Sequence, residues 1–397
     1  MRLKIKIPYS SIVALRQIFV IAIIIFTITF AIRASNSMLA TTIPLVAKYI
    51  FHFSPFLVGF LSSLLFIFSF ISSTLINSRL SAKKREKMLK IFASIYALVF
   101  PLFYFANPIL IWLDVSIAGF SMGIIFPNIV NYVSSIGDQK TRERMIALYT
   151  TALSTSLIVS PLLESLILAK FSLLTSFLIF SIFSFLVPIF SFKIKFNEDK
   201  KEKLLSSKEV LKSPSFIASV FNNLIYDIPF GMLVTFGGIY AISLFHASYS
   251  LAVMIFSFYY LTSFLSRFFF IIRTPRNIIA IIYANALITI FGLLAISLSP
   301  SLLVYVISLI LLGIPHGLTY LSSLIIISRS FKDEKSRNVA NSYFSSIGLS
   351  GSIPLIMGYV VEKIGLRCTF TLLSFISLVI FILFLIESKK VKELANL

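Results

Sequence analysis

The sequence has 397 residues, of which 58% are hydrophobic and only 13% charged, and its formal net charge is +20 at pH 7. Soluble domains carry roughly 25% charged residues, so this composition excludes a soluble protein and predicts a membrane protein with many spans. The single cysteine, Cys368, excludes a disulfide framework, and the separated histidines His52, His246 and His316 form no local metal motif. We expect no metal and no cofactor.

Basic residues occur in short clusters between long apolar runs, which is typical of cytoplasmic loops that face an anionic membrane leaflet. This distribution argues against nucleic acid as a partner and indicates the lipid bilayer instead. Residues 1–17 have the basic flank of a secretory signal, but the apolar run that follows is too long for a signal peptide. We therefore expect an uncleaved first span.

A membrane-spanning helix needs about 20 mostly apolar residues. Twelve segments meet this requirement: 17–46, 54–77, 90–106, 108–134, 144–168, 171–192, 215–240, 248–272, 277–297, 301–328, 338–361 and 366–386. Of the 35 lysine and arginine residues, 29 lie in the termini and the loops on their side, and four lie in the other loops. This bias predicts that both termini are cytoplasmic, and we expect a multi-pass protein of the plasma membrane.

The chain divides near its midpoint, where 193–212 is the only long polar segment. We expect an N-terminal six-helix half over 1–192, a charged cytoplasmic linker over 193–214, and a C-terminal six-helix half over 215–397. The predicted fold class is an all-α membrane bundle of twelve transmembrane helices in two pseudo-symmetric halves.

An internal repeat supports this division. At an offset of 194 residues, Gly119 and Gly123 pair with Gly313 and Gly317, and the serine-rich spans 54–77 and 248–272 also align. We expect these glycines to allow close helix packing. Duplicated halves are typical of secondary transporters, whose substrate site lies near the midplane between the repeats.

Two six-helix halves joined by a charged loop resemble the major facilitator superfamily. The signature of that family between the second and third spans reads roughly G-x-L-x-D-R-x-G-R-K. Here Arg79 and the basic run that includes Lys83 and Lys84 remain, whereas Ser78 stands at the aspartate and Thr74 and Ser81 at the glycines. The resemblance implies that these basic residues belong to a gating loop, and we group Arg267 with them.

A second family signature, G-x-x-x-G-P-x-x-G-G, marks proton-coupled drug antiporters. It is similar to the run Ser156, Ser160, Pro161, Glu164 and Ser165, in which every glycine is replaced. This resemblance favours export over uptake.

Ionisable side chains inside spans cost at least about 2.5–3.5 kcal/mol each on insertion scales, so each is a functional candidate. The six candidates are Arg33, Asp114, Glu164, Asp227, Arg267 and His316. The family resemblance implies that the first, fourth, seventh and tenth spans line a central cavity. The cavity residues expected there are Arg33, Asn36, Thr41, Asp114, Asn223, Tyr226, Asp227, His316 and Tyr320. The candidates for proton coupling are Asp114, Glu164 and Asp227.

Structural roles compete with these assignments. Glu164 is either a proton site or a group solvated near the outer surface, and His316 is either a cavity residue or a packing residue. Arg267 is expected to cap a neighbouring helix or reach the cytoplasmic surface. Arg33 and Asp227 are 194 residues apart, so the repeat predicts an ion pair between them at matched depth.

No P-loop, H-E-x-x-H or G-x-S-x-G motif occurs, which argues against an ATP-driven transporter and a membrane hydrolase. We expect a monomeric secondary transporter rather than an enzyme, moving a small organic solute by alternating access, coupled to protons, and exporting it. One alternative is an uptake symporter for a sugar or an organic anion, with Arg33 as the anion's partner. The alternative of another class is a membrane receptor on the same fold that transports nothing.

Overall fold

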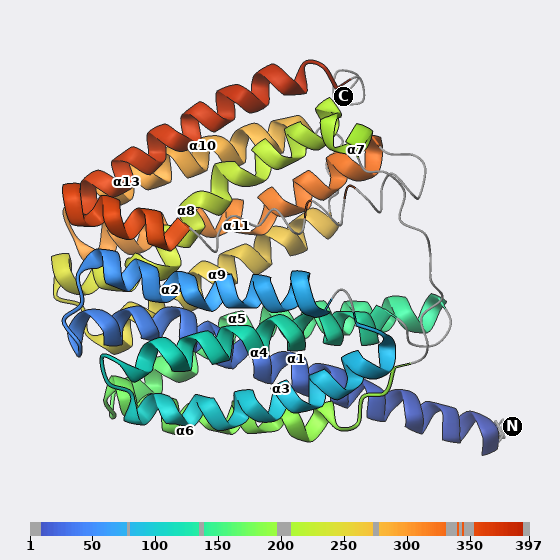
Figure 1. Ribbon diagram of the computed structural model, residues 1–397. Coiled ribbons are helices and arrows are strands. Elements are labelled where there is room, and N and C mark those ends of the chain that lie inside the picture. Colours follow the sequence, from blue (N-terminus) through green and yellow to red (C-terminus); the bar gives the residue numbers. More distant parts are fainter. Residues whose placement is uncertain are drawn as a thin grey trace, which may run out of the picture.

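The computed structural model describes residues 9–77, 80–134, 139–196, 208–272, 278–330, 340, 344 and 353–391. Within these ranges the chain is helical and contains no strand, and eleven helices are long and apolar enough to cross a membrane (Figure 1). They are α1 (Tyr9–Tyr49), α2 (Pro55–Phe70, continued by a π-helical stretch to Ile76), α3 (Ala82–Leu102), α4 (Leu110–Ser134), α5 (Gln139–Leu168), α6 (Leu173–Ser191), α8 (Pro214–Phe245), α9 (Tyr249–Ile272), α10 (Ile278–Ser297), α11 (Leu302–Ser330) and α13 (Ile353–Ser388). The short helix α7 (Lys208–Lys212) precedes α8.

Helix α13 contains two crossings rather than one. Gly365 interrupts it with φ 79° and ψ 168°, a backbone conformation that favours glycine because no Cβ is present. The chain folds back at this point, so the start of α1 and the end of α13 lie at the same end of the bundle (Figure 1). The break falls between the predicted spans 338–361 and 366–386. Most of 338–352 lies outside the described residues.

The internal repeat recurs in the packing. A Cβ atom at Gly119 on α4 would collide with the carbonyl oxygen of Leu65 on α2, and one at Gly313 on α11 would collide with that of Tyr259 on α9. The second pair lies 194 residues after the first. Gly123 and Gly317 approach their neighbours equally closely, so all four glycines permit close helix contact, as the sequence predicts.

The two turns that follow α1 and α8 also repeat. His52 and His246 both adopt φ 55°, and they are the only described residues other than glycine with positive φ. This left-handed conformation is uncommon for a side chain with a Cβ, and here it turns the chain sharply into α2 and α9. These two histidines are therefore turn residues.

Helices α1–α6 and α8–α13 form two groups, which are the lower and upper parts of Figure 1. We call the end that holds the turns 50–54 and 246–248 and the break at Gly365 the closed end. The two groups come together toward this end and diverge toward the other (Figure 1). Five hydrogen bonds between described residues join them: Tyr49 to the Ile239 carbonyl and to Ser243, the Phe56 amide to Glu362, Ser165 to Ser250, and the Leu355 amide to Ser63.

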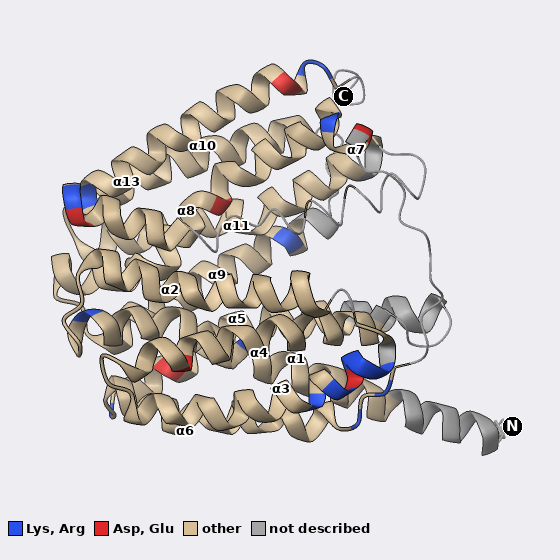
Figure 2. Ribbon diagram, in the orientation of Figure 1, with Lys and Arg blue, Asp and Glu red and all other residues tan. Residues whose placement is uncertain are grey.

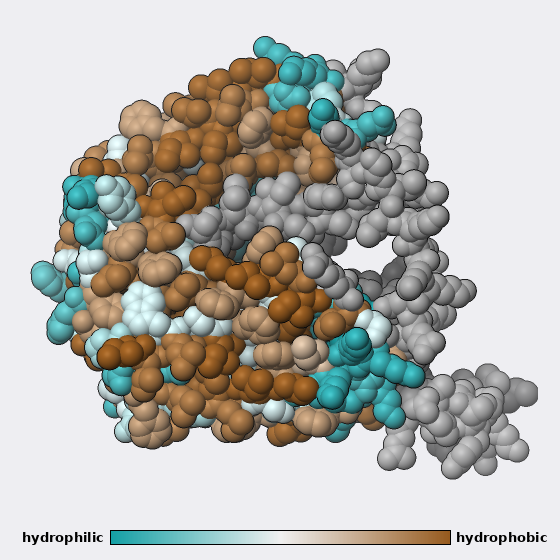
Figure 3. Space-filling view, in the orientation of Figure 1, coloured by the Kyte–Doolittle hydropathy of each residue, from teal (hydrophilic) through white to brown (hydrophobic). Residues whose placement is uncertain are grey.

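The distribution of charge fits a bilayer. Charged residues gather at the two ends of the helices, and only a few lie along their length (Figure 2). The flank of the bundle is largely apolar (Figure 3). Phenylalanine and aliphatic side chains such as Phe269, Phe291 and Leu303 are more than 60% exposed there, as expected for a surface that faces lipid.

Candidate functional site

A cavity of about 240 Å³ lies between the two groups of helices, with lining residues from α1, α2, α5, α8, α9 and α11. We call it the arginine cavity, because Arg33 and Arg267 line it together with His316, whereas no aspartate or glutamate of the described residues does. Its other polar lining groups are Asn36, Ser37, Ser154, Thr235 and Tyr260. Its apolar lining includes Phe66, Leu153, Leu157, Phe230 and Val234.

Arg33 lies on α1, and its guanidinium carbon is 5.3 Å from the centre of the Phe126 ring on α4, a cation–π distance. Its Nε is buried and has no hydrogen-bond partner among the described residues. Tyr149 and Tyr260 are among the described titratable groups near it, and a tyrosine is ordinarily neutral at pH 7. Arg33 is thus a cation inside the bundle that no carboxylate of the described residues balances.

Arg267 on α9 is held by the backbone of α11. Its Nε donates a hydrogen bond of 3.0 Å to the carbonyl of Gly317, and its Nη2 donates one of 3.3 Å to the carbonyl of His316. The sequence predicts that Arg267 caps a neighbouring helix, but these carbonyls lie in the middle of α11 (Leu302–Ser330), so Arg267 binds the backbone of that helix without capping its end. The side chain also lines the cavity, where the charge of Arg33 acts on it.

An aromatic cluster surrounds His316. The ring centres of Phe230, Tyr259 and Tyr260 lie 4.7, 5.1 and 5.5 Å from the centre of the imidazole. The Nδ1 atom of His316 is hydrogen-bonded to Ser263 Oγ at 2.8 Å, so the ring has a fixed orientation. His316 is therefore both a packing residue and a cavity residue.

A second cavity, also of about 240 Å³, adjoins the first and shares Phe230, Arg267 and His316 with it. We call it the aspartate cavity, because Asp227 lines it. Asn223, Tyr226, Thr319, Tyr320 and Phe344 are further lining residues. The Tyr226 and Tyr259 hydroxyl groups are 2.5 Å apart beside it.

Glu164 lies apart from both cavities, on α5, and its exposed fraction is 0%. Thr41 Oγ1 on α1 donates to its carboxyl group at 3.1 Å, and Thr42 Oγ1 also donates to it. No lysine, arginine or histidine among the described residues pairs with it. The alternative in which Glu164 is solvated near the outer surface is therefore wrong.

The structure brings some predicted site residues together and leaves others out. Arg33 and Asn36 line the arginine cavity, Asn223, Tyr226, Asp227 and Tyr320 line the aspartate cavity, and His316 lines both. Thr41 lines neither cavity, because its hydroxyl group faces Glu164. Asp114 also lines neither, although it is only 8% exposed, because it lies near the start of α4.

The ion pair predicted between Arg33 and Asp227 is wrong for this conformation. Both residues are described, and their side chains form no ion pair with each other. Arg33 contacts Phe126 and faces the arginine cavity, whereas Asp227 faces the aspartate cavity. Equivalent positions in two repeats lie at the same depth in the membrane, but their side chains can point in different directions around the helix axes. A separation of 194 residues therefore does not by itself bring two side chains together.

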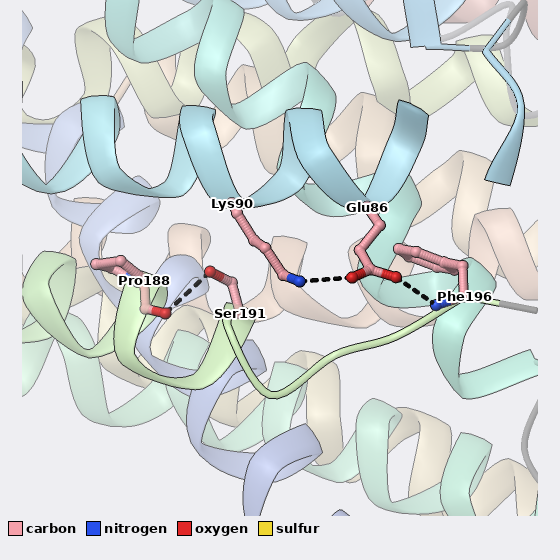
Figure 4. A network of polar contacts seen from close by, with 5 residues as sticks. All are labelled: Glu86, Lys90, Pro188, Ser191 and Phe196. Carbon is pink, nitrogen blue, oxygen red and sulfur yellow. Dashed lines mark hydrogen bonds and ion pairs between the residues drawn. The ribbon is translucent and has the colours of Figure 1, made fainter. Parts of the chain in front are cut away.

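The predicted gating loop lies at the end opposite the closed end. Arg79 falls outside the described residues, and Lys83 and Lys84 are exposed at the start of α3. Nearby, Glu86 accepts hydrogen bonds from Lys90 Nζ at 2.5 Å and from the Phe196 amide at 3.1 Å (Figure 4). These bonds fix the segment that follows α6 against α3.

Sequence reasoning did not predict Thr42, Phe230, Tyr260 or Ser263 as site residues. Ser263 aligns with Ser69 in the repeat. Because serine is common in these helices, this match did not predict that Ser263 binds a histidine. His52 and His246 were detectable, since they are 194 residues apart. Among the described residues no three of His, Cys, Asp and Glu are grouped as a metal site would need.

The sequence profile of the Major Facilitator Superfamily matches residues 25–353, which is most of the chain. The chain belongs to this superfamily. The match confirms that this twelve-helix all-α bundle is an integral membrane transporter of the major facilitator fold and not an enzyme. A comparison with curated protein sequences finds no match.

Solved structures of the superfamily fold resemble this chain over most of its length. A mutant of the nucleoside transporter NupG has a TM-score of 0.75 at 14% identity, covering 92% of this chain and 99% of that one. A POT family transporter in complex with a thioalcohol-conjugated peptide has a TM-score of 0.75 at 13% identity, covering 94% and 96%. A bacterial homolog of the human lysosomal transporter Spinster, in an inward-facing and occupied conformation, has a TM-score of 0.71 at 15% identity, covering 97% and 98%. At these identities the likeness shows the fold alone.

Proposed function

We propose that this superfamily member is a proton-coupled secondary transporter that moves a small organic solute by alternating access. The observation that carries this proposal is the arginine cavity, which is lined by both groups of helices, while hydrogen bonds between described residues join the groups toward the closed end. A solute in this cavity touches residues 1–192 and 215–397 at once. Rocking of these two halves about it then exposes it to alternate sides.

Proton coupling is proposed at Glu164. Intramembrane carboxyl groups are frequent proton carriers in transporters. Glu164 is buried, its partners among the described residues are threonine hydroxyl groups, and it lies on α5, which packs against both α1 and α9. Opening of the closed end separates α5 from α9 and wets this carboxyl group, so its protonation is linked to the conformation. Asp227 and Asp114 are the other proton-coupling candidates.

We propose that the protein is a monomer of the plasma membrane with cytoplasmic termini, so that the closed end faces outward and the cavity opens inward. The likeness to an inward-facing solved structure supports this reading. Export is the proposed direction, because the run from Ser156 to Ser165 resembles the signature of proton-coupled antiporters. Uptake by symport is the competing direction.

Purified protein in sealed proteoliposomes tests this proposal. The solute is first chosen by thermal shift from a metabolite panel, because a ligand of the native state raises apparent stability by mass action. A proton antiporter accumulates that solute when the lumen is more acidic than the medium. A symporter accumulates it under the opposite gradient, and a receptor that transports nothing shows no flux under either.

A further inference from the structure

We infer that the arginine cavity recognises a small organic oxyanion, with Arg33 binding the anionic group and the apolar wall binding the body of the solute. This inference rests on the proposed function, since it names the class of solute that is carried. The oxyanion can be a carboxylate, a phosphate or a phosphonate. Each of these groups presents two oxygen atoms that can accept hydrogen bonds from a guanidinium group.

The first step is the charge of the cavity. Arg33 and Arg267 both line it, and the field of Arg33 acts on Arg267. Neither arginine is paired with a carboxylate among the described residues. A charge taken out of water without a partner is costly, and two like charges side by side add to that cost. An anion in the cavity offsets this cost, whereas a cation increases it.

The second step separates the roles of the two arginines. Arg267 already donates to the carbonyls of His316 and Gly317, so two of its five N–H donors are bound to α11. Arg33 makes no hydrogen bond to another described residue, its buried Nε has no partner among them, and its guanidinium carbon lies 5.3 Å from the centre of the Phe126 ring. The edge of that group, which carries the N–H donors, remains available to an oxyanion. Arg33 is therefore the binding residue, and Arg267 contributes charge.

The third step concerns the body of the solute. Apolar side chains line the cavity together with the charged groups, among them Phe66, Leu157 and Phe230. A volume of about 240 Å³ accommodates a ring or a short chain rather than an oligomer. The preferred solute has one anionic group and one compact apolar part.

The experiment measures thermal stability of the purified full-length protein with matched probes at millimolar concentration. The anionic probes are benzoate, hexanoate and phenylphosphonate, the neutral ones are benzamide and hexanamide, and benzylamine is the cation. We expect one or more anions to raise the melting temperature while their neutral isosteres and the amine do not. Benzoate against phenylphosphonate distinguishes a carboxylate from a phosphate-like ligand. Equal shifts from the acid and its amide, or no shift with any anion, would overturn the inference.

Substitution of Arg33 supplies the second readout. Arg33→Gln should weaken binding of the preferred anion by about 10- to 100-fold, which corresponds to loss of a charged hydrogen bond. Arg33→Lys should recover part of the lost affinity, because lysine keeps the positive charge but lacks the paired N–H donors of a guanidinium group. Lys170→Gln, which removes an exposed charge elsewhere, is the matched control and should bind normally.

A purely structural arginine gives a different result. If Arg33 serves binding, Arg33→Gln leaves the ligand-free melting temperature unchanged or raises it. If the variant instead unfolds at lower temperature and its folded fraction still binds the anion like the wild type, the inference is wrong. Anion binding without flux in proteoliposomes contradicts only the proposed function. Flux of a solute irrespective of its charge contradicts only this inference.

Discussion

The hydroxyl group of Tyr49 at the end of α1 is 2.8 Å from Ser243 Oγ near the end of α8, and the two residues are separated by 194 positions, which is the repeat offset. Residues at equivalent positions in two repeats can touch only near the axis that relates the repeats. This contact therefore marks the pseudo-two-fold axis at the closed end. It is also the point where opening of that end must separate the two groups of helices.

Tyr49→Phe should destabilise closure of this end. The variant loses its hydrogen bonds to Ser243 and to the Ile239 carbonyl, and one such bond contributes about 0.5–1.5 kcal/mol. Distance distributions between spin labels at the ends of α1 and α8 should show a larger separated population. Tyr104→Phe is the control, because the Tyr104 hydroxyl group forms no hydrogen bond to another described residue. Identical distributions in the two variants would mean that the contact does not hold the end closed.

Gly59→Ala should impede closure more strongly. A Cβ atom at Gly59 on α2 would collide with the carbonyl oxygen of Pro354 on α13, which is backbone and cannot move aside alone. We expect the same spin-label assay to show the closed population depleted while the melting temperature changes little. Gly238→Ala, whose Cβ would make ordinary contact with Leu45 at 3.4 Å, is the matched control.

Gly119→Ala distinguishes packing within one group from packing between groups. Its Cβ would collide with Leu65, and α4 and α2 belong to the same group of helices. We expect a lower melting temperature without a change in the balance of conformations. Overpacking of this kind lowers the free energy of unfolding by about 1–3 kcal/mol. A shift of conformation with unchanged stability would contradict this assignment.

Glu164→Gln tests proton coupling. The amide keeps the size of the side chain and an oxygen that accepts from Thr41 and Thr42, but it cannot carry a proton. We expect solute exchange between labelled and unlabelled pools to continue while accumulation driven by a pH gradient is lost. Asp114→Asn is the comparator, because Asp114 is nearly buried but lines neither cavity. Loss of coupling in Asp114→Asn alone would move the proton site to α4.

The span positions could be predicted well from sequence because the bilayer imposes a length and an apolar composition on each helix. The break at Gly365 and the glycine contacts at the 194-residue offset follow directly from residues visible in the chain. The residues of the site were harder to predict from the sequence. The direction of each side chain depends on the rotation of its helix, which hydropathy does not determine. For this reason the sequence could not show that Thr41 faces Glu164 or that Arg33 does not contact Asp227. The aromatic cluster around His316 was hidden because phenylalanine and tyrosine are abundant throughout this sequence.

Native Cys368 offers a test of orientation. It is the only cysteine, it is exposed, and it lies three residues after Gly365 at the closed end. If that end faces outward, a membrane-impermeant maleimide should label it in intact cells, and Cys368→Ser should abolish the signal. A cysteine introduced as Lys201→Cys in the Cys368→Ser background should react only after the cells are opened. The reverse pattern would place the termini outside.

Transport by purified protein in sealed proteoliposomes tests the central claim most directly. The probe is the panel solute that gives the largest thermal shift, labelled, with an entrapped pH dye reporting proton movement in the same vesicles. The account predicts accumulation above equilibrium when a proton gradient is imposed, accompanied by proton flux, and a loss of both in Glu164→Gln. A solute that binds tightly but crosses the membrane under neither direction of the gradient would contradict it, and the protein would then be a receptor on a transporter fold.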